Sequence, residues 1–422
     1  MHDLLRQLAL NISREECFVG DVELLSGENM SKLRRITAVI KKDMLVLPRL
    51  DKVDIKVPKG MGKLKLLTYL GNYPVGDGSA NAVIQDGWKL EELSCFSQMR
   101  HLSMVKLERV AHSSTNAVLT DKKHLKELIL EWTKRGEGSY SEEDVRNTEK
   151  VFEQLIPPHN LEDLCIVGFF GRRYPTWFGT TCLSSLIYLN LIDVESCVEL
   201  PPTGQLPNLK YLRIDGAHAV TKVGPEFVGY KVGEPISNEF IAFPKLEWFF
   251  IKDMPNWEEW SFFKGVENVV DEGGEDGGDE IHNGDAQSTR LQLLPRLAKL
   301  KVEGCPKLRA LPRQLGEDTA SLKELLLIGA NNLKAVEDLL VLELLAIEDC
   351  EGMEKVSNLP QVSKLQVRGC PNLSHVEGLG NLQQLGLGED MQEISSRWVP
   401  GLQNQRQRLH GEDLDVYTLS TS

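Results

Sequence analysis

The chain has 422 residues, of which 41% are hydrophobic and 26% are charged, so it can bury a large core or form a long array of repeats. Its net charge of −14 and the lack of a basic stripe exclude non-specific nucleic-acid binding, which needs Lys and Arg to displace counterions. No stretch approaches the roughly 18 apolar residues of a membrane span, and the eight cysteines contain no C-x-x-C pair, which favours a reducing compartment.

The first twelve residues form a short amphipathic segment. Leu4, Leu5 and Leu8 fall on one face of a helix, which predicts an N-terminal helix. Asp3 and Arg6 interrupt any apolar stretch of the length that a signal peptide needs, so we expect no secretory leader.

A recurring L-x-x-L-x-L pattern organises most of the chain. Its last two apolar positions alternate with polar ones, which is typical of a short strand with one buried face. Because a unit of roughly 20–29 residues cannot bury that face alone, successive units must stack into one parallel sheet. We predict an α/β leucine-rich-repeat solenoid over residues 46–400, a curved parallel sheet with an irregular or helical convex side. The middle apolar positions are Leu102 (a weaker copy), Leu128, Leu164, Leu189, Leu212, Phe249, Leu300, Leu325, Leu345, Leu365 and Leu385.

One long gap between repeats, residues 131–160, predicts a helix. Ser141 is followed by three acidic residues, a composition that favours a helix N-terminus, and Pro157 ends the segment.

The residues between the leucines should face outward on the concave side of the sheet. Tyr188, Tyr211 and Trp248 stand just before three successive middle positions, and adjacent strands lie about 4.8 Å apart, so their rings should form one patch. Such residues are common interface anchors. The alternative is that the rings only pack on each other or under an inserted loop. The predicted protein-binding residues are Tyr188, Asn190, Tyr211, Arg213, Trp248, Phe250, Lys299 and Lys301.

Residues 264–290 are acidic and Gly-rich, with eight acids and no Lys or Arg between Glu267 and Asp285. We expect a disordered insertion that loops off the solenoid. A calcium site is the alternative, but the D-x-D-x-D-G register with a closing Glu is missing, so no metal is predicted.

Cys305, Cys350 and Cys370 each stand three residues after the last apolar position of a repeat. Leucine-rich repeats place an inward Asn or Cys at this bend, so these cysteines are predicted to be structural.

The sequence carries no recognisable catalytic motif. Gly62 and Lys63 are followed by Leu64, whereas a phosphate-binding loop needs Ser or Thr there to supply a hydroxyl. The G-x-S-x-G motif of serine hydrolases and the H-E-x-x-H motif of zinc proteases are both missing. We predict that the chain is not an enzyme and binds no cofactor.

Several segments resemble the C-terminal part of plant intracellular nucleotide-binding leucine-rich-repeat disease-resistance proteins of the coiled-coil class. These segments are "LERV" (107–110), "LTDKKHLKELILEW" (119–132), "GFFGRRYPTWFG" (168–179), "LPPTGQLPNLKYLRIDG" (200–216), "VGPEFVG" (223–229) and "FPKLEWFFIKDMPNWEEW" (243–260).

The resemblance also gives the N-terminus a meaning. In that family Met-His-Asp lies in the winged-helix end of the nucleotide-binding module, where the His approaches the ADP phosphate. Met1, His2 and Asp3 match this motif, so residues 1–45 would be a remnant of that module plus a linker. We expect the motif to be vestigial, with ADP or ATP bound only if a nucleotide-binding domain precedes it. Residues 46–98 would be an irregular start of the solenoid, and residues 401–422 a tail.

The resemblance implies a non-enzymatic recognition module of plant innate immunity in the cytoplasm, or in cytoplasm and nucleus. It would bind pathogen effectors, host proteins or the nucleotide-binding domain of a full-length relative, and neither nucleic acid nor a membrane. The alternatives are one piece of an ADP/ATP-dependent switch, an inactive truncated product, or an F-box-type adaptor, for which residues 1–60 match poorly.

Overall fold

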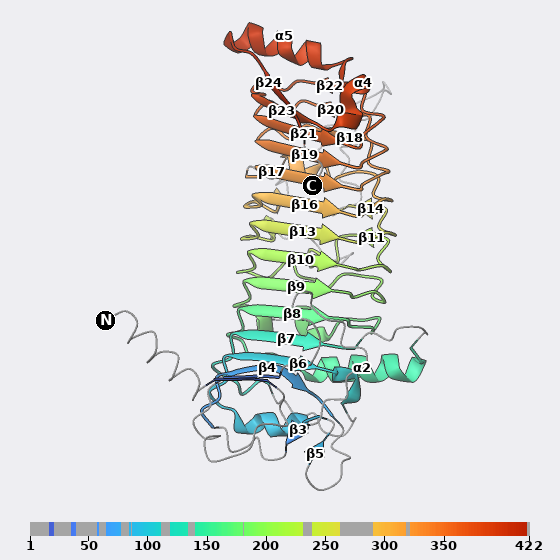
Figure 1. The fold of residues 1–422 in the computed structure, drawn as a ribbon. Coiled ribbons are helices and arrows are strands. Elements are labelled where there is room, and N and C mark those ends of the chain that lie inside the picture. Colours follow the sequence, from blue (N-terminus) through green and yellow to red (C-terminus); the bar gives the residue numbers. More distant parts are fainter. Residues whose placement is uncertain are drawn as a thin grey trace, which may run out of the picture. The chain divides into compact units, whose positions relative to one another are not determined.

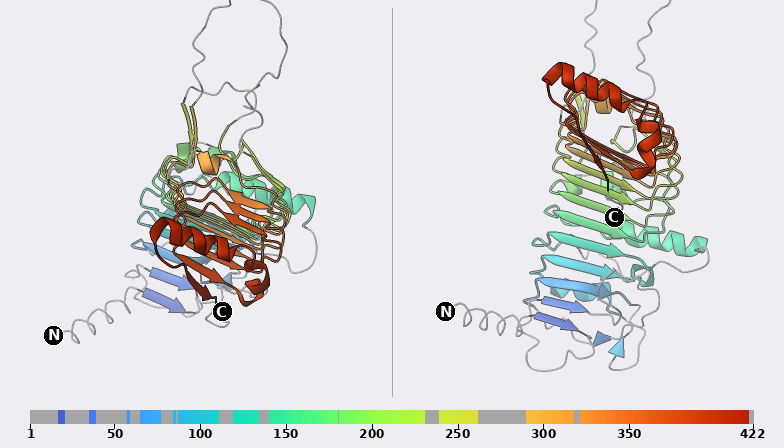
Figure 2. Two further views of the ribbon diagram at one scale, coloured as in Figure 1. Left: turned by 90° about the horizontal axis from the view of Figure 1, so that it is seen from above. Right: turned by 45° about the horizontal axis from the view of Figure 1, so that its top comes forward.

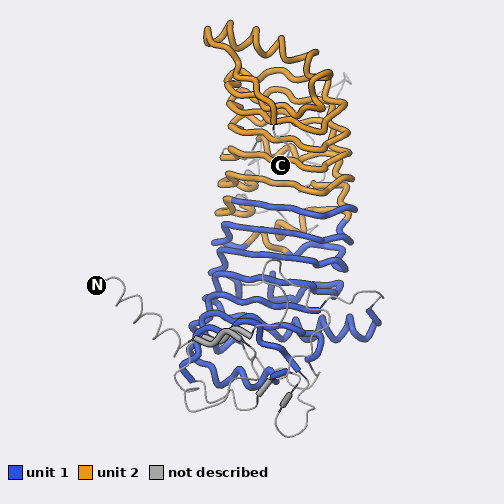
Figure 3. Tube along the Cα trace, viewed as in Figure 1, with its two compact units in different colours: residues 1–201, 206–220, 248–256 blue, residues 202–205, 221–247, 257–422 orange. Residues whose placement is uncertain are grey.

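A computed structural model describes residues 17–20, 35–38, 57–58, 65–76, 84–85, 87–110, 119–133, 140–179, 181–230, 239–261, 290–317 and 321–419. The chain divides into two compact units, coloured separately in Figure 3. Unit 1 comprises residues 1–201, 206–220 and 248–256, and unit 2 comprises residues 202–205, 221–247 and 257–422.

Unit 1 is built on a sheet of parallel strands, one from each repeat (Figure 1). Their order is β1 (Cys17–Gly20), β2 (Arg35–Ala38), β4 (Tyr69–Pro74), β6 (His101–Val105), β7 (Glu127–Glu131), β8 (Asp163–Val167), β9 (Tyr188–Ile192), β10 (Tyr211–Asp215) and β13 (Trp248–Lys252). The connections contain the 3-10 helices η4 (Leu90–Cys95), η5 (Leu107–Arg109), η6 (Thr176–Gly179) and η7 (Thr181–Leu183), the helix α2 (Glu142–Gln154), and the antiparallel pair β3 (Val57–Pro58) and β5 (Ile84–Gln85).

Unit 2 has the same plan. Its parallel strands are β16 (Lys299–Glu303), β17 (Glu324–Ile328), β19 (Leu344–Glu348), β21 (Lys364–Arg368), β23 (Gln384–Leu387) and β24 (Asp415–Thr418). A second small sheet joins β18 (Ala335–Glu337), β20 (Lys355–Ser357) and β22 (His375–Glu377), and two parallel pairs join β11 (Lys222–Val223) to β14 (Glu259–Trp260) and β12 (Glu239–Ala242) to β15 (Arg290–Leu293). The helices are α3 (Gln314–Glu317), η8 (Glu389–Met391), α4 (Gln392–Ser395) and α5 (Val399–His410).

The predicted leucine-rich-repeat fold is confirmed by the strand register. Every predicted middle position lies in a strand of its unit's sheet and is at most 1% exposed. The strict 20-residue period appears directly in the pairing, which aligns Leu325 with Leu345, Leu345 with Leu365, and Leu365 with Leu385. Identical spacing therefore produces identical register, and the leucines stack into a continuous core within each unit.

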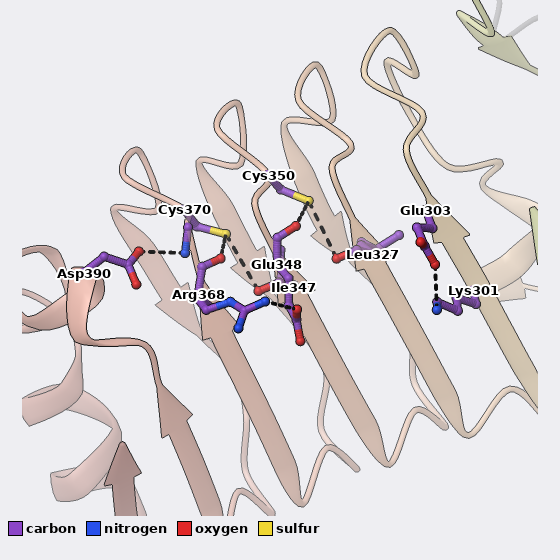
Figure 4. A network of polar contacts seen from close by, with 10 residues as sticks. Lys301, Glu303, Leu327, Ile347, Glu348, Cys350, Arg368, Cys370 and Asp390 are labelled. Carbon is purple, nitrogen blue, oxygen red and sulfur yellow. Dashed lines mark hydrogen bonds and ion pairs between the residues drawn. The ribbon is translucent and has the colours of Figure 1, made fainter. Parts of the chain in front are cut away.

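The three predicted structural cysteines lie at the bend that follows a strand, and all three are fully buried. The thiol of Cys350 donates to the carbonyls of Glu348 (3.3 Å) and of Leu327 in the preceding repeat (3.8 Å), as Figure 4 shows. Cys370 makes the same two contacts with Arg368 (3.2 Å) and Ile347 (3.9 Å). Burial raises the pKa of Cys370 to about 12, so its thiol stays protonated and links one repeat to the next.

The predicted helix is confirmed as α2. Ser141 caps it, since its hydroxyl accepts from the Asp144 amide (3.1 Å) while the Asp144 carboxylate accepts from the Ser141 amide (3.2 Å). This reciprocal pair satisfies two amides that a helix N-terminus leaves open. The helix ends at Gln154, shortly before Pro157.

The ends of the chain add strands that carry no clear repeat pattern. Within residues 1–45, β1 and β2 pair in parallel with each other, and β2 pairs with β4. Most of α5, the long red helix in Figure 2, falls in the segment predicted only as a tail. This helix contacts β22, and the His410 ring contacts the Gly380 carbonyl at 2.8 Å. The strand β24 then extends the unit 2 sheet next to β23. The predicted insertion lies outside the described residues except for Arg290, which starts β15.

Candidate protein-interaction surface

Six of the predicted binding residues lie together in unit 1. The parallel register places Tyr211 between Tyr188 and Trp248, and it places Arg213 between Asn190 and Phe250. These positions alternate with the buried leucines, so their side chains lie on the exposed face of the unit 1 sheet.

The four aromatic rings contact one another without being hidden. Ring centroids are 6.1 Å apart for Tyr188 and Tyr211, 5.4 Å for Tyr211 and Phe250, and 6.1 Å for Phe250 and Trp248. Tyr188 and Trp248 each remain 47% exposed, which is high for large aromatic side chains. Mutual packing therefore orients the rings while leaving much of their area open to contact.

Arg213 is partly neutralised within the patch. Its guanidinium lies 2.6 Å from the Asp215 carboxylate two residues along the same strand. This pair directs the Arg213 guanidinium toward Asp215, and the hydrogen bond raises the pKa of the guanidinium.

The register also shows residues that the sequence reasoning missed. The row that contains the rings of Tyr188, Tyr211 and Trp248 continues through the preceding repeats, where the pairing aligns His101 with Glu127, Glu127 with Asp163, and Asp163 with Tyr188. We call the full set the acidic–aromatic row: Tyr69, His101, Glu127, Asp163, Tyr188, Tyr211 and Trp248. The sequence does contain a signal for these polar residues. Each stands directly before the middle leucine of its repeat, the same position that Tyr188, Tyr211 and Trp248 occupy.

The polar half of the acidic–aromatic row is crowded with carboxylates. The His101 ring stacks on Tyr69, with centroids 4.1 Å apart, and its Nδ1 lies 2.7 Å from the Glu127 carboxylate. Burial, with a contribution from the Glu127 charge, raises the pKa of Asp163 to about 6. Burial, with a contribution from the Glu108 charge, raises the pKa of Glu131 at the end of β7 to about 7.

Replacing Glu131 with Gln should change how stability depends on pH. The pKa of Glu131 is about 7 in the folded chain against an ordinary value of 4.5, so between these values the folded state binds more protons than the unfolded state. The free energy of unfolding contributed by Glu131 therefore falls as pH rises through this window. The variant should unfold like the parent at about pH 4, below both pKa values, and should be roughly 1–3 kcal/mol more stable than the parent at about pH 8, since one pKa unit corresponds to about 1.4 kcal/mol.

Urea unfolding at the two pH values measures this effect. Glu143→Gln, which removes an exposed carboxylate from α2, is the matched control and should show no such difference. An equal gain for Glu131→Gln at both pH values would contradict the assignment.

The two predicted lysines lie in unit 2 and are already engaged. Lys299 forms an ion pair with Glu324 on the next strand at 2.8 Å, and Lys301 pairs with Glu303 at 2.7 Å (Figure 4). Their charges are thus largely neutralised where they stand, which leaves the exposed rings of unit 1 as the stronger candidate contacts.

Met1, His2 and Asp3, the proposed vestige of a nucleotide sensor, lie outside the described residues. Within the ranges that the structure describes, no three His, Cys, Asp or Glu side chains gather so as to hold a metal ion. None of the helices in that same part of the chain combines the length and apolarity that crossing a bilayer requires.

Comparison with known proteins identifies relatives of the repeats. A family model described as R13L1/DRL21 LRRs matches residues 90–217, which contain the strands from β6 to β10. The chain is 29% identical over 229 residues to disease-resistance RPP13-like protein 1 of Arabidopsis thaliana, a match that covers 53% of this chain and 19% of that protein. It is 29% identical over 223 residues to disease-resistance protein RGA4 of Solanum bulbocastanum, covering 52% of this chain and 20% of the relative.

The chain thus spans about a fifth of the length of these curated relatives. Among solved structures, the leucine-rich-repeat domain of the type III effector XopL aligns with 18% identity and a TM-score of 0.34, over 55% of this chain and 68% of that one. The sequence motifs, the repeat register and the matched relatives agree with one another. Over the matched residues, the repeats of this chain are similar to the leucine-rich repeats of plant disease-resistance proteins.

Proposed function

We propose that the chain is a non-catalytic recognition module of plant defence that binds a protein through the exposed face of the unit 1 sheet. The partner would be a pathogen effector or a host protein. The observation that carries the proposal is the row of in-register rings, in which Tyr188 and Trp248 keep 47% of their surface exposed. Rings already oriented by their neighbours lose little conformational freedom on binding, which makes them efficient anchors.

The relatives support the defence context. Their names describe disease-resistance proteins, and the family model covers most of the strands that carry the surface. A repeat sheet with one open face is suited to contact another macromolecule, because adjacent strands present side chains at regular spacing.

A binding screen tests this proposal. The full chain is probed against a panel of purified effectors and host proteins, and each binder is titrated against variants of the rings. Tyr211→Ala and Trp248→Ala should each weaken a specific partner about 10- to 100-fold, the loss expected for a buried aromatic anchor. Val198→Ala is the matched control, since Val198 is an exposed apolar residue of unit 1 outside the strands.

Val198→Ala should bind the partner with the affinity of the parent chain, unlike the two ring variants. If the partners that bind the chain retain full affinity for both ring variants, the binding surface lies elsewhere and the assignment to this face fails.

A further inference from the structure

The exposed face of unit 1 also indicates the chemistry of its partner. We propose that it recognises a cationic protein segment, one that presents Arg or Lys side chains to the acidic–aromatic row. This inference rests on the proposed function and specifies the class of partner for the same surface.

The geometry brings carboxylates and rings into one continuous row. Asp163 is the direct strand neighbour of Tyr188, and Glu127 is the neighbour of Asp163 on the other side. Adjacent strands lie about 4.8 Å apart, so an extended segment lying across the strands meets the two carboxylates and then the rings in succession.

The charge on this face is not balanced. The strands β6, β7 and β8 carry Glu127, Glu131 and Asp163 but contain no Lys or Arg. Within the described residues, these strands form one ion pair, between Glu127 and His101, and neither Asp163 nor Glu131 forms an ion pair there. The charge of His101 acts on Asp163 without such a contact and lowers its pKa, against the larger effect of burial. Farther along the sheet, Arg213 is occupied by Asp215, and Lys252 lies at the end of β13.

Unit 2 provides an internal reference for this imbalance. On the corresponding positions of its strands, Lys299 pairs with Glu324 at 2.8 Å and Arg368 pairs with Glu348 at 2.7 Å. The repeats of this chain can therefore neutralise facing charges by pairing neighbouring strands. Among β6, β7 and β8, the ion pair within the described residues is the His101–Glu127 contact, and it leaves Asp163 and Glu131 outside any such pair. The crowding is reflected in the pKa of Asp163, which burial and then Glu127 raise to about 6. An incoming cation would relieve both the repulsion and part of the desolvation cost.

The aromatic rings favour a cationic partner, as the carboxylates do. A Lys ammonium or Arg guanidinium within about 6 Å of a Tyr or Trp ring is attracted to the ring face. Exposed faces of Tyr188 and Trp248 therefore favour cations, whereas an acidic segment would be repelled by Glu127 and Asp163. A purely apolar partner would use the rings and leave the carboxylates buried without partners, which is unfavourable.

Labelled synthetic peptides test the proposal directly. Three peptides of equal length alternate Gly with Arg, with Gln or with Glu, and their binding to the full chain is measured by fluorescence polarisation near neutral pH. The Arg peptide should bind at least about tenfold more tightly than the Gln peptide, and the Glu peptide should bind most weakly. Equal affinity for the Arg and Gln peptides, or no measurable binding of either, overturns the inference.

Variants then locate the binding. Asp163→Asn should weaken the Arg peptide about tenfold, and Trp248→Ala should weaken it by a similar factor. Glu143→Gln changes the net charge by the same amount on α2 and should leave the affinity unchanged. If Glu143→Gln weakens binding as much as Asp163→Asn, the peptide responds only to the overall negative charge of the chain, and the inference is wrong.

The two proposals fail differently. If an effector or host protein loses affinity for Tyr211→Ala and Trp248→Ala but not for Asp163→Asn, the face binds proteins but does not select a cationic segment. Circular dichroism of Asp163→Asn checks that the isosteric change leaves the fold intact.

Discussion

Phe152→Ala should lower the free energy of unfolding by about 3–5 kcal/mol, the range for truncating a buried Phe. Phe152 lies on the inner side of α2, and its side chain is 0% exposed. Its ring is surrounded by other rings, whose centroids lie 5.1 Å (Trp132), 4.7 Å (Phe169) and 5.4 Å (Trp177) away. Removing the ring leaves a cavity among rigid aromatic groups that cannot collapse to fill it.

The backbone contacts of Phe152 should survive this change. Its carbonyl accepts from the Trp177 indole at 3.2 Å, and alanine keeps that carbonyl. The loss in urea unfolding therefore reports ring packing. Faster hydrogen exchange over residues 142–154 would assign the loss to α2.

Lys150→Ala, on the exposed side of the same helix, is the matched control and should change stability by less than about 0.5 kcal/mol. A loss below about 1 kcal/mol for Phe152→Ala would show that the aromatic cluster does not hold α2 in place.

The repeat architecture could be predicted from the sequence because its signal is redundant. The same three apolar positions mark each strand in the sequence. The prediction of a strand at an irregular copy, such as the one around Leu102, is therefore strengthened by the clear copies that follow it, and this copy does form β6. The helix α2 could also be predicted, because Ser141 and the acidic residues after it stabilise the helix N-terminus through local contacts. In both cases the deciding interactions lie within a few residues along the chain or repeat at a fixed spacing.

The candidate site could be predicted only in part, because half of it depends on register between repeats. Aromatic residues stand out in a sequence, and Tyr188, Tyr211 and Trp248 were identified as neighbours for that reason. Asp163 and Glu127 look like ordinary surface acids until the strand pairing places them side by side in the same row. The pairing of Lys299 with Glu324 depends on register for the same reason, because the two residues lie on neighbouring strands. Lys301 instead pairs with Glu303 two residues along its own strand.

The strand β24 shows a different limit. Residues 411–422 lack the L-x-x-L-x-L pattern, yet Asp415–Thr418 pairs with β23 in register. The residues of β24 are exposed or half-buried, so backbone pairing rather than side-chain burial joins this strand to the sheet, and its side chains are less constrained than those of an interior repeat. Sequence periodicity does not report such a strand.

Gly168→Ala should cost about 3 kcal/mol or more, because two penalties act at the same residue. Gly168 directly follows β8 and has a φ of 69°, and its amide donates to the Ile192 carbonyl of the next repeat at 2.9 Å. A Cβ at this position would lie 2.4 Å from the backbone oxygen of Trp132 in the preceding repeat. The left-handed backbone costs an alanine about 1–2 kcal/mol, and overpacking against a backbone carbonyl adds about 1–3 kcal/mol.

Two other glycines separate these penalties. Gly411 has the same φ of 69° but meets no atom within 4 Å of an added Cβ, so Gly411→Ala should show only the backbone cost, about 1 kcal/mol. Gly401 lies in α5 with nothing within 4 Å of an added Cβ, so Gly401→Ala should stabilise the helix by roughly 0.5–1 kcal/mol. Because Gly168 lies in unit 1 and the other two in unit 2, hydrogen exchange of the adjacent amides is the suitable measurement. If Gly168→Ala cost no more than Gly411→Ala, the close approach of the Trp132 carbonyl would not be what fixes glycine at the bend between these repeats.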